Sequence, residues 1–131
     1  MEVQELGPGL WRWTTAQPGA GESQSLYWEG PGAVCLFDPS VPAEPDEAAR
    51  FWRHLDADVE RTGGPVAVFL TTRPRGTGVL ELVRRYGASL HGPLRGLEQL
   101  PAGVAVVSAA PGCTAYRVPS SPPLVVGPVD A

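Results

Sequence analysis

Five side chains whose types could support chemistry stand where strands are expected to end. They are Asp38 after an apolar run, Arg73 and Arg75 around a proline in a loop, His91 before Gly-Pro, and Cys113 in a Pro-Gly-Cys-Thr string. In open α/β sheets, ligands gather beyond the carboxyl ends of the strands. Two guanidinium groups there could bind a carboxylate or a phosphate, and a histidine could transfer a proton. These five residues are therefore the candidate ligand-binding residues.

Each candidate also has a structural interpretation. Asp38 could hydrogen-bond Ser40 or a nearby backbone group, and the Arg73 and Arg75 pair could simply lie in a solvated loop. No serine, cysteine or carboxylate partner can be assigned to His91 from spacing. The sequence therefore assigns no catalytic residue.

The strands that must position these residues are read from hydrophobic periodicity. Trp11 and Trp13 flank Arg12 in a strand that begins after a Gly-Pro-Gly turn, so both indoles should face one core. The polar stretch 17–24 predicts a mobile loop. Residues 66–70 form a continuous apolar run, as expected of a central strand buried on both faces. Further strands are expected at residues 25–28, 33–37, 88–91, 104–108, 114–118 and 124–126.

Two helices are expected between these strands. Apolar residues recur every three or four positions across residues 46–62, with Asp46 as the N-terminal cap or a first-turn acid. His54 lies among charged residues of this segment, which predicts a position on the helix surface. A second apolar stripe covers residues 79–86 and ends at Gly87. The order of elements predicts one layered α/β (α+β) domain over residues 1–131, with a mixed sheet and two main helices on one face.

This order of parts resembles the metallo-β-lactamase fold family. The resemblance is carried by a strand ending in Asp-Pro, a strand ending in Leu70-Thr71, the string Tyr86-Gly87-Ala88, and Pro111-Gly112-Cys113-Thr114. It implies half of the family's αβ/βα sandwich, because the chain is about half the expected length. It also implies that the sheet face normally packed on the second half needs another cover.

The resemblance places a His-x-His-x-Asp-His metal motif where this chain has other residues. The three histidine positions hold Thr72, Pro74 and Thr77, and the aspartate position holds Gly76. Cys113 stands where a further histidine ligand would be, and one cysteine does not make a zinc site. Pro128 follows the last apolar run, where the family has a bridging aspartate. The resemblance therefore implies a degenerate, metal-free site with no cofactor.

Composition narrows the classes of partner. Ten basic residues, all arginine, face fourteen acidic ones for a net charge of −4, so nucleic acid is a poor default partner. No apolar run is long enough to cross a bilayer, and the first residues lack a hydrophobic signal core, so we expect a cytoplasmic protein that does not use a membrane. Cys35 and Cys113 form no CxxC pair, which predicts two buried or half-buried thiols.

The combined expectation is a non-catalytic binding or assembly module. Four tryptophans carry more apolar surface than a one-sided half-sandwich hides easily, so we expect a homo-oligomer or a partner protein to cover the exposed sheet face. The alternative is a divergent hydrolase with a rebuilt, metal-independent cleft around Asp38, Arg73, Arg75, His91 and Cys113.

Overall fold

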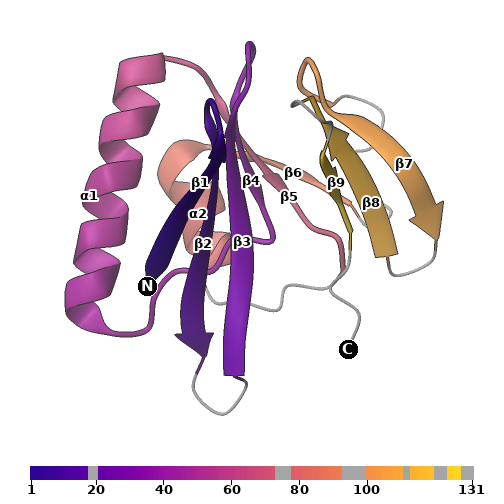
Figure 1. Cartoon of the computed structure of the whole chain (residues 1–131). Helices are drawn as coiled ribbons and strands as arrows, with labels where there is room; N and C mark the ends of the chain where they lie inside the picture. Colours follow the sequence, from indigo (N-terminus) through magenta and orange to yellow (C-terminus); the bar gives the residue numbers. More distant parts are fainter. Residues whose placement is uncertain (18–20, 73–77, 93–99, 111–112, 120–123, 128–131) are drawn as a thin grey trace.

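The computed structural model describes residues 1–17, 21–72, 78–92, 100–110, 113–119 and 124–127. These residues form a six-stranded sheet, a three-stranded sheet and two helices, so the mixed α/β class is confirmed (Figure 1). The large sheet contains, in spatial order, β1 (Glu2–Gly7), β2 (Leu10–Gln17), β3 (Gly21–Glu29), β4 (Val34–Phe37), β5 (Val66–Phe69) and β6 (Ser89–His91). The small sheet contains β7 (Ala105–Ala110), β8 (Cys113–Val118) and β9 (Leu124–Val126).

The large sheet changes from antiparallel to parallel at β4. Strands β1 to β4 pair with antiparallel neighbours, whereas β4, β5 and β6 run parallel. Parallel strands require crossover connections, which are α1 (Pro45–Thr62) and α2 (Val79–Tyr86). As a consequence, the carboxyl ends of β4, β5 and β6 meet at one end of the sheet.

Local sequence explains where the helices begin and end. The Glu44 carboxylate caps α1 by accepting hydrogen bonds from the backbone N–H groups of Asp46 and Glu47. The prediction of Asp46 as a cap is therefore replaced by its alternative, a first-turn acid, because Pro45 already occupies the first helical position. Gly63 ends α1 and Gly87 ends α2, both in the left-handed conformation that glycine adopts without strain.

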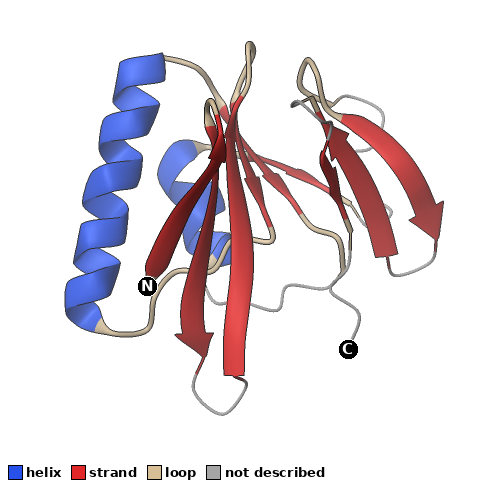
Figure 2. Ribbon diagram, in the orientation of Figure 1, coloured by secondary structure: helices blue, strands red, loops and turns tan. Residues whose placement is uncertain are grey.

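Both helices pack on the same face of the large sheet, as predicted. Phe51 and Leu55 of α1 and Leu82 of α2 are buried against strand residues that point to this side. Figure 2 shows the two helices on one side of the sheet and the small sheet on the other. The alternation of side chains along each strand thus divides the interior into two cores.

The opposite sheet face is covered by the chain itself. Trp28, Phe37 and Phe69 of the large sheet pack on Tyr116 and Val118 of β8 in the second core. Phe37 and Phe69 stack with ring centroids 4.6 Å apart, and Tyr116 meets Phe69 edge-on at 5.1 Å. We expected a homo-oligomer or a partner protein to cover this face, but β7, β8 and β9 of the same chain fold back over it.

Two strand predictions near the N-terminus need correction. Strands β2 and β3 pair as far as Gln17 and Gly21, so most of the stretch expected as a mobile loop belongs to a long hairpin, and residues 18–20 lie outside the described residues. Residues before the Gly-Pro-Gly turn also form a strand, β1.

Neither described helix combines the length and the apolar character that crossing a membrane would require.

Candidate functional site

Asp38 joins the carboxyl ends of β4 and β5. Its carboxylate accepts hydrogen bonds from the backbone N–H of Thr71 at 2.9 Å and from Thr71 Oγ1 at 2.5 Å. The backbone N–H of Asp38 donates to Phe69 O at 2.8 Å, and its carbonyl accepts a hydrogen bond from Ser25 Oγ at 2.8 Å. Asp38 has a φ of 48°, which is uncommon outside glycine and lies in the region that aspartate tolerates better than most residues. These contacts give Asp38 a structural role through Thr71, a partner that the sequence did not identify.

His91 is the last residue of β6 and is held inside the fold. Its side chain is buried, stacks on Phe69 with centroids 4.8 Å apart, and shares a hydrogen bond of 2.8 Å between Nε2 and Ser89 Oγ. Tyr116 reaches the same strand ends from β8, where its hydroxyl donates to Leu70 O at 2.9 Å. Burial raises the pKa of Tyr116 to about 12, and the charge of Asp38 adds to the shift. Stacking and hydrogen bonding thus fix the imidazole in place.

Of the remaining candidates, only Cys113 lies in the part of the chain that the structure describes. The backbone N–H of Thr114 donates to Thr71 O at 2.7 Å, which brings β8 close to Asp38. Because burial alternates along β8, half-buried Cys113 lies on the opposite strand face from buried Thr114. Arg73 and Arg75 lie outside the described residues.

The predicted burial of the two thiols is confirmed. Cys35 is fully buried in β4, where burial raises the pKa of the thiol to about 12, and Cys113 is half-buried.

Within the described ranges, no group of three or more His, Cys, Asp and Glu residues could hold a metal ion. Of the positions aligned with the family's metal ligands, Thr72 and Cys113 are described, whereas Pro74, Gly76, Thr77 and Pro128 are not.

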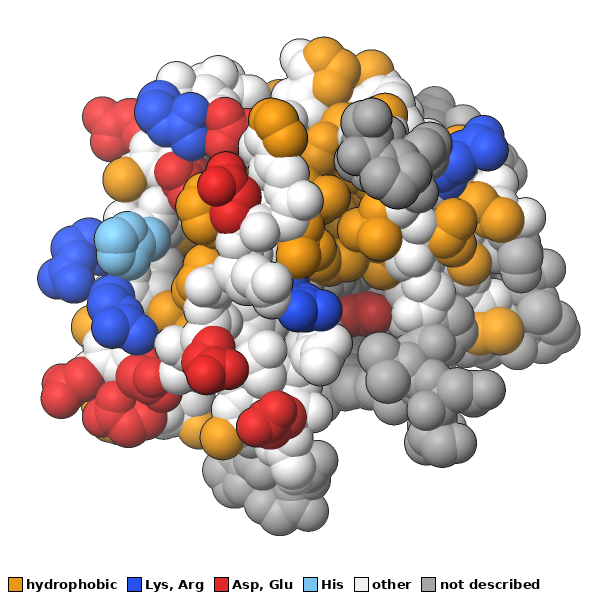
Figure 3. Space-filling view, viewed as in Figure 1, with side chains coloured by type: hydrophobic (Ala, Val, Ile, Leu, Met, Phe, Trp, Pro, Cys, Tyr) orange, Lys and Arg blue, Asp and Glu red, His pale blue; other side chains and the backbone are white. Residues whose placement is uncertain are grey.

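A shallow pocket of about 190 Å³ lies between the two sheets near Asp38. Arg12 of β2, Gln24 of β3 and Asp38 contribute polar groups to its wall, and Leu124 of β9 contributes an apolar one. The space-filling view shows hydrophobic side chains gathered between the sheets on this side of the molecule (Figure 3). The volume is below the range of about 300–1,000 Å³ that is typical of small-molecule sites.

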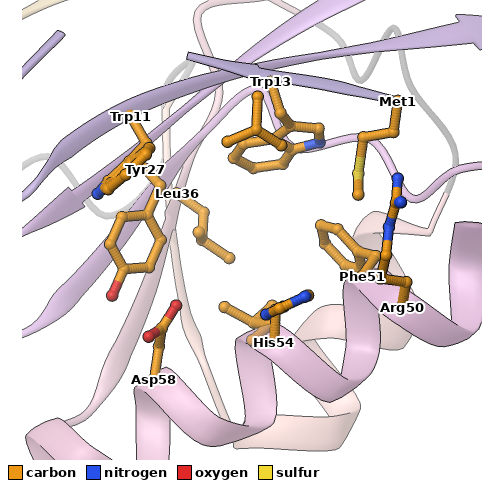
Figure 4. A pocket seen from close by; sticks show the side chains of 11 residues that line it. Met1, Trp11, Trp13, Tyr27, Leu36, Arg50, Phe51, His54 and Asp58 are labelled. Carbon is orange, nitrogen blue, oxygen red and sulfur yellow. The ribbon is translucent and has the colours of Figure 1, made fainter. Parts of the chain in front are cut away.

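A larger pocket of about 590 Å³ lies on the helix side of the large sheet, between α1 and strands β1 to β4. Figure 4 shows side chains from the sheet and from α1 facing each other across it. The sheet contributes Trp11, Trp13, Tyr27 and Leu36, and α1 contributes Phe51 and Leu55. The volume and the aromatic walls are typical of small-molecule sites.

One edge of this pocket is charged. Arg50, His54 and Asp58 line it from three successive turns of α1, because residues four apart share a helix face. The His54 side chain is exposed on the helix surface, as predicted, and it also borders the pocket. The spacing of these three residues beside Phe51 and Leu55 was the available signal. It does not distinguish a pocket edge from an ordinary solvated face.

Comparisons with known proteins identify no family, since no family model matches the chain and no curated protein matches it. The family resemblance therefore stays a prediction based on element order and short strings of residues.

Proposed function

We propose that this chain is a non-catalytic binding module and that it binds a small molecule in the pocket between α1 and the large sheet. The observation that carries the proposal is a contrast between two places in the fold. At the strand ends, Asp38 and His91 are engaged in hydrogen bonds and stacking. Beneath α1, a cavity of about 590 Å³ has aromatic walls and a charged edge.

The metallo-β-lactamase-like framework is part of this proposal. It is supported by an antiparallel run of strands that becomes parallel at β4, with one helix in each crossover. Asp38 after β4, Leu70-Thr71 after β5 and Gly87-Ala88 after α2 stand at the expected places in this order. In this interpretation the strand ends that carry the family's site serve here as a structural joint, in which Asp38 links the ends of β4 and β5. Ligand binding takes place instead on the helix side of the sheet.

Self-association stays a prediction, although its original reason is weaker. The sheet face that motivated it packs on β7 to β9, so a partner is not needed to cover that face. Light scattering coupled to size exclusion tests it directly. Twice the chain mass of 13.8 kDa would support a dimer, and a single chain mass would refute it.

A fragment screen observed through the protein's amide resonances tests the binding proposal. We expect binding compounds to shift amides of α1 and β1 to β4. His54→Trp places a large ring at the pocket edge and should abolish these shifts, whereas Ala57→Trp adds the same ring at an exposed position that does not line the pocket. Fragments that cluster instead around Asp38 and His91 would refute the proposal. So would turnover of a thioester, phosphoester or lactone panel that disappears in His91→Ala.

A further inference from the structure

The walls of the pocket beneath α1 present carbon rather than polar atoms. The Nε1–H of Trp13 donates to Ser40 O at 3.0 Å, and the hydroxyl of Tyr27 donates to the Glu29 carboxylate at 2.9 Å. Both aromatic residues therefore satisfy their polar groups inside the protein and turn ring surface to the cavity. Trp13 and Phe51 contact each other across the two layers, with centroids 5.7 Å apart. Such walls favour a flat, apolar ligand body.

At the other end of the charged edge, a single arginine already engages two carboxylates. Asp58 accepts a hydrogen bond from Arg61 at 3.0 Å, and the same guanidinium binds both oxygens of Glu29 at 2.9 and 2.8 Å. This arrangement lowers the pKa of Glu29, chiefly through the Arg61 hydrogen bonds. A ligand cation would have to compete with Arg61 for these carboxylates.

The positive end is different. Glu47 lies 3.9 Å from the Arg50 guanidinium, which is half exposed, and an exposed pair of this length contributes little. Figure 4 shows Arg50 and His54 projecting from α1 at the pocket. A guanidinium presents several donors in a plane that matches a carboxylate, and an adjacent imidazole can add one more. The edge thus offers anion-binding capacity at the Arg50 end.

We propose that the pocket binds a ring-bearing carboxylic acid, with the ring against Trp13 and Phe51 and the carboxylate directed to Arg50 and His54. The inference rests on the proposed binding function and specifies its ligand class. It accounts both for the apolar walls and for Arg50, whose ion pair with Glu47 spans 3.9 Å. A purely apolar ligand would make no use of this guanidinium.

Isothermal titration calorimetry with three probes of one shape tests the inference. The probes are 2-naphthoate, 2-naphthalenemethanol and 2-naphthylmethylammonium. We expect the carboxylate to bind about tenfold more tightly than the alcohol, which corresponds to about 1.4 kcal/mol, and the ammonium to bind more weakly than the alcohol. Arg50→Gln should reduce carboxylate binding to the level of the alcohol and leave alcohol binding unchanged. Arg53→Gln removes the same charge from an exposed position of α1 outside the pocket lining and should leave the order unchanged.

The wild-type comparison decides the question even if a variant folds poorly. Equal affinity for all three probes, or tightest binding of the ammonium, would overturn the carboxylate assignment while leaving the binding module intact. Failure of every probe and every fragment to bind beneath α1 would overturn the binding proposal as well. Loss of carboxylate preference in Arg53→Gln as strongly as in Arg50→Gln would show that net charge, not the pocket, selects the ligand.

Discussion

Replacing Asp38 should distinguish a structural joint from a strained functional residue. Asp38→Ala removes the carboxylate that accepts hydrogen bonds from the hydroxyl and the backbone N–H of Thr71. Thr71 is buried, so both of its donors lose this acceptor inside the protein. Hydrogen bonds to a charged group contribute roughly 1.5–3 kcal/mol each. Because Asp38 is half-buried, we use the lower value for each bond, so Asp38→Ala should lower the free energy of unfolding by about 3 kcal/mol.

Two further variants separate the contributions at this position. Asp38→Asn keeps one acceptor oxygen for the Thr71 N–H and should cost about 1 kcal/mol. Asp38→Gly loses both bonds but removes the strain of the left-handed conformation, so it should be about 1 kcal/mol more stable than Asp38→Ala. The predicted order of stability is wild type, Asn, Gly, Ala.

Urea unfolding measures this order. With a slope of about 2 kcal/mol per molar urea, Asp38→Ala should lower the midpoint by about 1.5 M. When a residue is kept in a strained conformation for function, replacing it often makes the protein more stable. An Asp38→Ala midpoint equal to or above that of the wild type would therefore refute the structural interpretation and restore Asp38 as a functional candidate.

Three other predictions concern the junction of the sheets and the thiols. Gly87 and Gly92 have similar φ values, 59° and 61°, but a Cβ would meet nothing within 4 Å at Gly87 and the Tyr116 hydroxyl at 2.1 Å at Gly92. Gly92→Ala should therefore lower the melting temperature more than Gly87→Ala, and equal losses would contradict the close approach of β8. In the native state Ellman's reagent should label Cys113 but not buried Cys35. In Cys113→Ser only the Cys35 thiol is left, so fast labelling of this variant would contradict the burial of Cys35. The pKa of Tyr116 is raised to about 12 in the folded protein, while the unfolded side chain ionises near 10. The unfolded state therefore loses this proton first, and the free energy of unfolding should fall as the pH rises from about 10 to about 12. The fall should be less steep in Tyr116→Phe, and identical slopes for the two proteins would refute this.

Much of the fold follows from short-range patterns in the sequence. The three- and four-residue spacing of apolar residues located α1, and the uninterrupted apolar run predicted β5 as a central strand. The strand-end position of Asp38 was also predicted, because a strand that ends in Asp-Pro is a local signal. Its bonding partner, Thr71, is 33 residues away in the chain, and no local pattern identifies such a contact.

The covering of the second sheet face could not be read in the same way. Residues of β8 alternate between buried and less buried positions, which predicts a strand but not the surface against which it packs. Tyr116 is fully buried because its ring meets Phe37 and Phe69 and its hydroxyl reaches β5 and β6. The pocket beneath α1 depends on such long-range packing too, since Trp13 and Phe51 meet only after β2 and α1 have docked.

A crystal structure of the chain with its tightest-binding naphthalene probe tests the central claim most directly. We expect ligand density between α1 and strands β1 to β4, with the ring against Trp13 and Phe51 and the polar group at the Arg50 end. Density at the strand ends beside Asp38 and His91, with the space beneath α1 closed by its own side chains, would contradict it.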